Sequence, residues 1–198
     1  MLIFKVKRRI ALLLMHFVQR ARVVWYSLLS TNRFVGNPTR YQPMQVVGGG
    51  KIAFESNVRI GVFPSPGFLD SYAYLEARNE TSSITVGEGT WISNGFRCIA
   101  EHTAVVIGRN CLIGANVEVL DSDFHGLKVE ERGISKPEWA SPVHVGDNVF
   151  LGSNVRILKG VSIGTGAVIA NSSVVITDIP ADVIAAGAPA RVIRELVT

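Results

Sequence analysis

The sequence has few charged residues, few cysteines and no long apolar run. Lys, Arg, Asp and Glu make up only 18% of the 198 residues, whereas 47% are hydrophobic. This balance excludes a disordered polar chain and a highly charged nucleic-acid-binding tail. The two cysteines, Cys98 and Cys111, are too few for a disulfide framework and lie at no metal-ligand spacing. We interpret both as reduced core residues of a single folded domain.

The first 40 residues lack Asp and Glu altogether, although they hold eight Lys and Arg side chains. The net charge of +4 is therefore an average, because residues 41–198 hold 12 basic and 16 acidic side chains. The apolar stretch that accompanies these basic residues is short of the roughly 20 residues that span a bilayer. No small-residue cleavage site of a signal peptide follows it.

We expect residues 1–40 to form a basic, amphipathic and helical segment. Two interpretations of its role remain open. Residues 1–30 contact an anionic membrane surface, as basic interfacial helices do, or the helix packs on the rest of the protein or on another subunit.

An aliphatic residue recurs at every sixth position through much of the remaining chain. One block runs through Val145, Leu151, Ile157, Ile163, Ile169 and Val175, and an earlier block has Val86 and Ile92, slips at Cys98 and resumes at Ile107, Ile113 and Val119. A period of six matches neither an amphipathic helix nor a hairpin meander with irregular loops. The period indicates a repeat architecture.

Gly or Asn stands three residues after the aliphatic position. The residues are Gly89, Gly95, Asn110, Asn116, Asn148, Asn154, Gly160 and Gly166. Gly and Asn enter the left-handed backbone region at the lowest cost, so the pattern predicts a turn every six residues. Short strands alternating with such turns fit a coil of three strands, each coil stacking on the next through parallel hydrogen bonds at about 4.8 Å.

These hexads resemble the hexapeptide-repeat acyltransferases over roughly residues 46–194. The resemblance implies an all-β fold, a left-handed parallel β-helix, and a homotrimer with active sites between subunits. We divide the chain into an N-terminal segment (1–40), a β-helix catalytic domain (41–179) and a C-terminal tail that clamps the cofactor (180–198). Polar or proline-containing insertions at about 62–83 and 124–142 should interrupt the coil and select the acceptor, and the second should project over a neighbouring subunit.

Within the family, three segments resemble the galactoside, maltose and xenobiotic O-acetyltransferase branch. They are residues 113–125, the interruption that follows, and the ending 178–191. The form Asp-Ser-Asp-Phe-His at 121–125 is most similar to sugar acetyltransferases of bacterial surface-polysaccharide synthesis. The resemblance implies transfer of an acetyl group from acetyl-CoA to a hydroxyl of a sugar or polysaccharide precursor. We expect a cytoplasmic enzyme, peripheral at the inner face of the membrane if residues 1–30 bind there, with neither metal nor nucleic acid as a partner.

His125 stands where the repeat breaks into the second insertion. A sugar hydroxyl is a weak nucleophile, so a base must accept its proton, and an imidazole with a pKa of about 6.5 is suited to this. The resemblance assigns that role to His125, although the residues alone also allow a loop cap. Asp121 and Asp123 share one face of a strand, and either could orient the imidazole. Asp123 is included with the catalytic residues, and solvated acids at the loop mouth are the alternative.

The family also places an asparagine on the coil before the histidine. Alignment to the family motif without a gap places this asparagine at Ser93, and a one-residue gap moves it to Asn94. Because the Asn94 amide suits an acceptor hydroxyl, we assign the role to Asn94. The family's acidic residue from the N-terminal region has no counterpart, because residues 1–40 contain no Asp or Glu.

The resemblance places the pantetheine arm of acetyl-CoA between two prisms. The Ser153 amide would polarise the thioester carbonyl, and Phe150, which replaces a family Trp, would form an apolar wall. Asn171 falls at another backbone contact position. Arg191 and Arg194 match the arginines that hold the CoA phosphates, although a solvated basic tail is the alternative.

A family lysine near the phosphates is replaced by Thr177, and Lys159 is the candidate to supply that charge. A γ-class carbonic anhydrase requires a close histidine pair, which the sequence lacks. Acetylation of a soluble small molecule or amino sugar, including N-acetylation, and a non-catalytic scaffold both remain open.

Overall fold

The computed structural model describes residues 2–196, so Met1, Val197 and Thr198 lie outside the described part. One helix, α1 (Leu2–Leu28), precedes three sheets of short strands. Sheet A contains β3 (Lys51–Phe54), β6 (Ser83–Val86), β9 (Ala104–Ile107), β12 (Val143–Val145) and β15 (Ser162–Ile163). Sheet B contains β1 (Thr39–Arg40), β4 (Arg59–Ile60), β7 (Trp91–Ile92), β10 (Leu112–Ile113), β13 (Phe150–Leu151), β16 (Val168–Ile169), β18 (Val183–Gly187) and β19 (Ala190–Glu195). Sheet C contains β2 (Met44–Gly48), β5 (Ala73–Ala77), β8 (Arg97–Ala100), β11 (Glu118–Leu120), β14 (Arg156–Ile157) and β17 (Val174–Val175).

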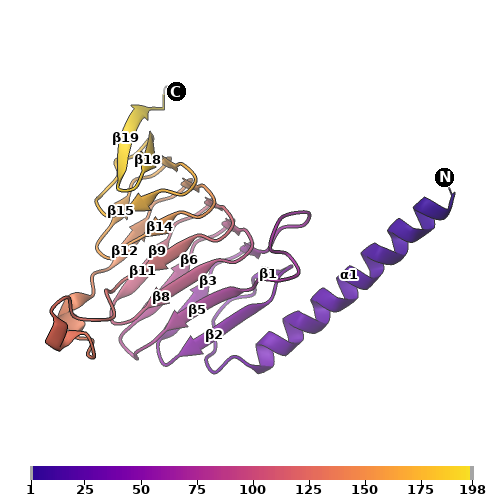
Figure 1. Ribbon diagram of the computed structural model, residues 1–198, viewed down its shortest axis with the longest axis horizontal. Helices are drawn as coiled ribbons and strands as arrows, with labels where there is room; N and C mark the ends of the chain where they lie inside the picture. The colour runs from indigo at the N-terminus through magenta and orange to yellow at the C-terminus, as the bar shows by residue number, and fades with distance from the viewer. Residues whose placement is uncertain (1, 197–198) are drawn as a thin grey trace.

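The chain visits sheets C, A and B in rotation, one strand at a time, as Figure 1 shows. Through most of the prism, a strand therefore pairs in parallel with the strand one full coil further along. Among the described strand pairs, only β18 and β19 are antiparallel. The fold is the predicted left-handed parallel β-helix, a prism whose three faces are the three sheets.

The aliphatic column that repeats every six residues lines the interior of the prism. Each of its members is at most 3% exposed, including Cys98. The register slip therefore comes after Cys98 and not at it: three extra residues, 101–103, form a wider turn between β8 and β9. Cys98 and Cys111 are free and buried, and burial raises the pKa of both thiols.

The predicted turns are confirmed at all eight Gly and Asn positions. Their φ angles lie between 53° and 75°. Ser172, six residues after Gly166, adopts the same conformation with φ 61°. A left-handed residue at each of these corners turns the chain from one face of the prism to the next.

Both insertions leave the prism at corners. The first is shorter than expected, because β5 lies inside the range 62–83 and pairs with β2 and β8. Its prolines, Pro64 and Pro66, both fall in residues 61–72, between sheets B and C, and proline cannot donate to a ladder. The second leaves between sheets C and A, spans residues 121–142, and projects from the prism in Figure 1. It contains two short 3₁₀ helices, η1 (Val129–Glu131) and η2 (Pro137–Trp139).

The segment from residue 180 onward is not a separate tail. The coil continues through β18, which pairs in parallel with β16, and β19 then folds back against it. These strands extend sheet B beyond the expected end of the β-helix at residue 179.

Helix α1 leaves the wide end of the prism at an angle, and its first turns lie far from the sheets (Figure 1). Its second half rests on residues 61–72. Gln19 donates to the Phe68 carbonyl at 2.6 Å, Arg22 donates to the Ser71 carbonyl at 2.8 Å, and Tyr26 packs on Tyr72. Within residues 2–196, no helix combines the length and apolarity needed to cross a membrane.

We predict that Leu151→Ala lowers the free energy of unfolding by about 2–5 kcal/mol, because it leaves a cavity inside the closed coil. Leu112→Ala is the matched control. Leu112 lies on the neighbouring strand but points outward and is 53% exposed, so its loss should be about 0.5 kcal/mol or less. Urea denaturation followed by circular dichroism measures both. Equal losses would contradict the assignment of these two positions to the inside and the outside.

Candidate active site

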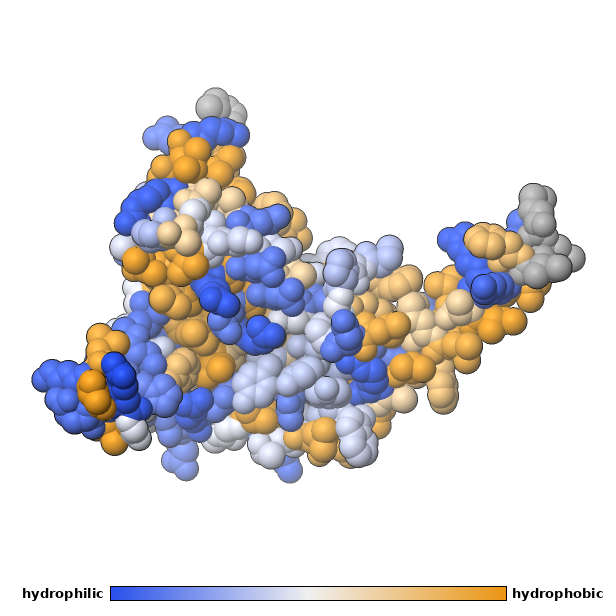
Figure 2. Space-filling view, in the orientation of Figure 1, coloured by the Kyte–Doolittle hydropathy of each residue, from blue (hydrophilic) through white to orange (hydrophobic). Residues whose placement is uncertain are grey.

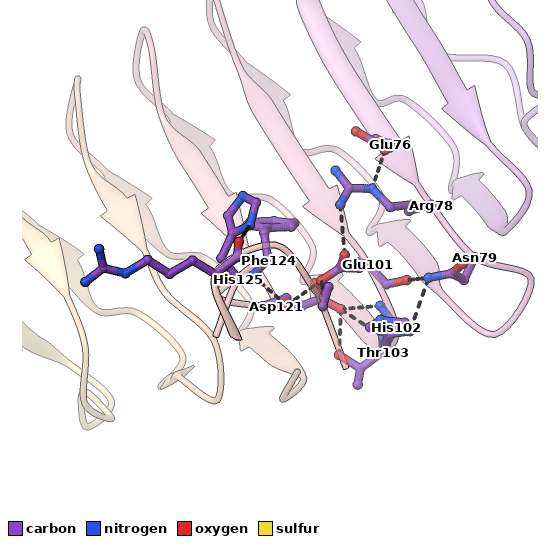
Figure 3. Close-up of polar contacts among 12 residues, drawn as sticks. Glu76, Arg78, Asn79, Glu101, His102, Thr103, Asp121, Phe124 and His125 are labelled. Carbon is purple, nitrogen blue, oxygen red and sulfur yellow. Dashed lines mark hydrogen bonds and ion pairs between the residues drawn. The ribbon is translucent and has the colours of Figure 1, made fainter. Parts of the chain in front are cut away.

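His125 lies just after β11, where the chain leaves the corner between sheets C and A. Phe124, immediately before it, has a φ of 61°, which is a strained value for a bulky residue. The Phe124 amide donates to Ser122 Oγ at 3.0 Å, and the Arg78 guanidinium lies 5.0 Å from the centre of the Phe124 ring. Figure 3 shows Phe124 between Arg78 and His125. These contacts hold the strained backbone in place and point His125 outward.

The His125 imidazole is oriented by a backbone carbonyl. Its Nδ1 lies 2.8 Å from the Arg132 carbonyl oxygen. A carbonyl only accepts, so Nδ1 carries the hydrogen and Nε2 of the neutral ring keeps its lone pair. The exposed ring lines an open cleft of ≈ 680 Å³, together with Phe124, Leu127, Arg132 and Leu158. This arrangement leaves a basic nitrogen accessible to a molecule in the cleft.

Within residues 2–196, no hydrogen bond or ion pair joins either candidate carboxylate to His125. Asp121 is fully buried and accepts the amides of Glu101, His102 and Thr103 at 2.6, 3.1 and 2.8 Å. It therefore closes the three-residue turn at the register slip, as Figure 3 shows.

Asp123 accepts a hydrogen bond from Lys159 Nζ at 2.5 Å. Lys159 also donates to the Trp139 carbonyl at 2.6 Å. Both residues therefore fasten the second insertion to the prism, and Asp123 also lines the cleft at His125.

Glu101 is a residue at this site that the sequence interpretation missed. It is 3% exposed and accepts hydrogen bonds from Ser122 Oγ at 2.5 Å, Ser135 Oγ at 2.8 Å and Arg78 Nη1 at 2.8 Å. Burial alone would raise the pKa of Glu101, but the two hydroxyls and Arg78 outweigh it and lower the pKa. Ser122 and Ser135 lie on either side of His125 along the chain, so Glu101 fixes the insertion on both sides of the imidazole. The sequence offered one signal for Glu101, because this acidic residue stands among the three residues that interrupt the six-residue period.

Asn94 does not present its amide to a ligand. The side chain is 1% exposed, its Oδ1 accepts the Val62 amide at 3.0 Å, and its Nδ2 donates to the Val62 and Pro66 carbonyls at 3.0 and 2.9 Å. Asn94 therefore anchors the first insertion. Its neighbour Ser93, the other candidate from the sequence, is partly exposed and lines a groove on sheet B.

That groove follows an outward row of apolar side chains on sheet B. Trp91, Leu112 and Phe150 stand in register on three adjacent strands and are 37%, 53% and 46% exposed. With Val62 they line a depression of ≈ 250 Å³. The same register continues through Val168 and Ile184 to Arg194.

Arg191 and Arg194 lie on one face of the β18–β19 hairpin. Their partners are Ala186 and Ile184, which are two residues apart and therefore share a face. Residues three apart on a regular strand would point to opposite faces, but the irregular register of this hairpin brings Arg191 and Arg194 to the same face. Both arginines are exposed, and within the described residues their recorded hydrogen bonds go only to nearby carbonyls.

Of the remaining candidates, Ser153 and Asn171 lie at the corner between sheets B and C, and Thr177 lies at the corner between sheets C and A. The Ser153 amide donates to Asn171 Oδ1 at 2.9 Å, so the expected oxyanion donor is occupied by that side chain. Thr177 is exposed after β17. No cluster of three or more His, Cys, Asp or Glu residues that could hold a metal ion occurs between residues 2 and 196.

The candidates thus form two separate groups within one chain. His125 lies at the corner between sheets C and A, which is opposite sheet B in a three-faced prism, whereas Phe150 and Arg194 lie on sheet B. The cleft at His125 and the groove at Phe150 have no lining residue in common. A single chain therefore does not bring the imidazole to the groove.

Comparisons with known proteins agree with this repeat. Residues 142–177 match the family model "Bacterial transferase hexapeptide (six repeats)", and residues 104–131 match "Hexapeptide repeat of succinyl-transferase". Galactoside O-acetyltransferase of Escherichia coli strain K12 is 39% identical over 115 residues, which cover 58% of this chain and 55% of that protein. The chain spans about half the length of the curated relatives it matches.

Two solved structures share the fold. A galactoside acetyltransferase in complex with coenzyme A is 32% identical with a TM-score of 0.54, and the match covers 73% of this chain and 66% of that one. The polySia-specific acetyltransferase NeuO is 27% identical with a TM-score of 0.58, and the match covers 81% and 72% of the two chains.

We predict that Glu101→Gln lowers the free energy of unfolding at neutral pH by about 2–4 kcal/mol, because two hydroxyls and Arg78 lose a charged acceptor. Since the pKa of Glu101 is lowered on folding, its stabilisation is present above the ordinary glutamate pKa of about 4.3 and is lost as the pH falls through the lower folded-state value. The gap between wild type and variant should therefore narrow in acid.

Urea titrations at several pH values measure this gap. Glu138→Gln is the control, because Glu138 is an exposed glutamate of the same insertion. A gap that stays constant down to strongly acidic pH would show that the Glu101 charge does not hold the insertion.

Proposed function

Because the chain belongs to the hexapeptide-repeat transferase family, we propose that it transfers an acetyl group from acetyl-CoA to a hydroxyl of a sugar or polysaccharide precursor. The observation that carries this proposal is the His125 imidazole, whose Nδ1 is bound to the Arg132 carbonyl while the exposed ring lines an open cleft. A neutral imidazole held in this tautomer is suited to act as a general base.

In the proposed reaction, His125 Nε2 takes the proton of the acceptor hydroxyl as its oxygen attacks the thioester carbonyl carbon. The tetrahedral intermediate then collapses, the carbon–sulfur bond breaks, and the imidazolium returns its proton to the departing thiolate. The products are the acetyl ester and free CoA thiol. Arg132, whose carbonyl fixes the ring, acts as a positioning residue through its backbone.

The groove on sheet B is the proposed site for acetyl-CoA. Trp91, Leu112 and Phe150 offer an apolar row for the pantetheine arm, and the row ends at Arg194, with Arg191 on the same face. Within residues 2–196, the hydrogen bonds of both guanidinium groups go to backbone carbonyls, and guanidinium groups are suited to phosphates. Asn171 lies at the corner beside this region, whereas Thr177 lies at the corner between sheets C and A and Lys159 is already held by Asp123.

We further propose a homotrimer, because one chain does not unite the two groups. The insertion at 121–142 of one copy would bring His125 to the sheet B groove of the next copy, and the active site would lie between subunits. Within one chain, His125 lies at a corner of the prism and Phe150 lies on the opposite face. This separation supports the assembly. The cytoplasm, where acetyl-CoA is available, is the proposed compartment.

The remaining candidate functions differ in the molecule that accepts the acetyl group. An amine acceptor would make the enzyme an N-acetyltransferase, a soluble small molecule would replace the glycan precursor, and a scaffold would have no acceptor. The similarity to NeuO and to galactoside acetyltransferases supports a sugar hydroxyl.

We predict that the full chain releases free thiol from acetyl-CoA with a sugar or glycan acceptor, and that His125→Ala lowers kcat by about 10²–10⁴-fold through loss of the base. His144→Ala is the control, because His144 is exposed on β12, away from the cleft. The assay compares hydroxyl and amine acceptors by thiol release. Full turnover in His125→Ala on a confirmed acceptor would remove His125 from the mechanism, and no release with any acceptor would favour a scaffold.

We predict that the double variant Arg191→Gln, Arg194→Gln raises KM for acetyl-CoA by about ten- to a hundredfold, because two charge-assisted contacts to phosphate are lost. Acetyl-pantetheine lacks those phosphates, so its KM should not change. Arg97→Gln with Arg156→Gln removes the same charge from exposed positions on sheet C and serves as the control. Equal effects on both acetyl donors would place the arginines away from the phosphates.

A further inference from the structure

Helix α1 has a continuous apolar face that its own chain leaves uncovered. Apolar residues separated by alternating steps of four and three lie on one side of a helix. Here the series is Ile10, Leu14, Phe17, Ala21, Val24 and Leu28. Phe17 is 72% exposed and Leu28 is 74% exposed. Figure 2 shows hydrophobic side chains along the length of α1.

The opposite side of α1 is the one that rests on the prism. Gln19 is buried there, and Arg22 and Tyr26, three and seven residues further along, are partly buried against residues 61–72. At about 100° per residue, Phe17 lies on the far side of the helix from Gln19. The contact with the prism therefore positions α1 while the apolar face points away.

Basic side chains flank the uncovered face, and the helix contains no acidic residue. Lys7, Arg9 and Arg20 lie beside the apolar series, whereas Lys5, Arg8 and Arg22 lie on the opposite side of the helix, where Arg22 is bound to the prism. A helix with Trp, Phe and Leu on one face and Lys and Arg on the other matches the composition of helices that lie in a membrane surface. Trp25, beside the apolar series and 59% exposed, suits the boundary between lipid and water.

We propose that α1 lies in the plane of an anionic lipid bilayer surface, with its apolar face in the acyl-chain boundary and the basic residues that flank this face at the lipid phosphates. Charge complementarity selects this occupant. In a bundle of α1 helices from several copies, the positions beside the apolar series would bring Lys7, Arg9 and Arg20 together without an acidic partner from α1. This inference is independent of the proposed acetyl transfer.

The test is co-sedimentation of the full chain with vesicles of phosphatidylcholine containing phosphatidylglycerol, against vesicles of phosphatidylcholine alone. We expect binding to the anionic vesicles, weakened by added salt. Phe17→Glu should lower this binding by about a hundredfold, since it removes an apolar anchor and adds a negative charge. Ala11→Glu adds the same charge at an exposed position beside the apolar series and should cost about fivefold or less.

Circular dichroism verifies that both variants are folded, and light scattering without lipid measures their mass. An unchanged oligomeric mass in Phe17→Glu supports the proposal. A lower mass in that variant alone would place the face between copies of the chain and overturn it. Equal binding of wild type and Phe17→Glu, or no preference for anionic vesicles, would overturn it as well.

Discussion

The structure depends on one backbone constraint, a left-handed residue at the corner of the coil every six residues. Gly and Asn meet this requirement at little cost, so the strands between them stay in register from coil to coil. That register stacks Ile, Leu and Val along the interior and fixes which residues face outward. Segments outside the repeat leave the prism only at its corners, and the candidate base lies on one of them.

The polar residues that adapt the repeat also hold the candidate site. Asp121 closes the wider turn at residues 101–103, and Glu101 in that turn binds Ser122 and Ser135 of the insertion. A departure from the six-residue period thus creates the buried carboxylate that holds His125 in place. Phe124 remains in a strained conformation because Arg78 and Ser122 hold it.

A three-faced prism separates what the proposed chemistry must combine. His125 occupies a corner, and the apolar row that ends at Arg194 occupies the opposite face. The proposed assembly of copies would bring the two groups together in one site. The basic helix α1 leaves the wide end of the prism and is free for another task, so catalysis and attachment to a surface would use different parts of the molecule.

By itself, the sequence determined the repeat, its turns and the break before His125. The six-residue spacing of aliphatic residues and the preference of Gly and Asn for the left-handed backbone region are local properties that can be read along the chain. Only the tertiary structure decided which polar groups meet. Asn94 and Lys159 looked available for ligands, but segments distant in sequence occupy them, and Glu101 became significant through partners on another coil and on the insertion. Arg191 and Arg194 share a face because of a bulge that no period predicts. Hydrogen-bond partners depend on distances across coils, and residue spacing does not encode those distances.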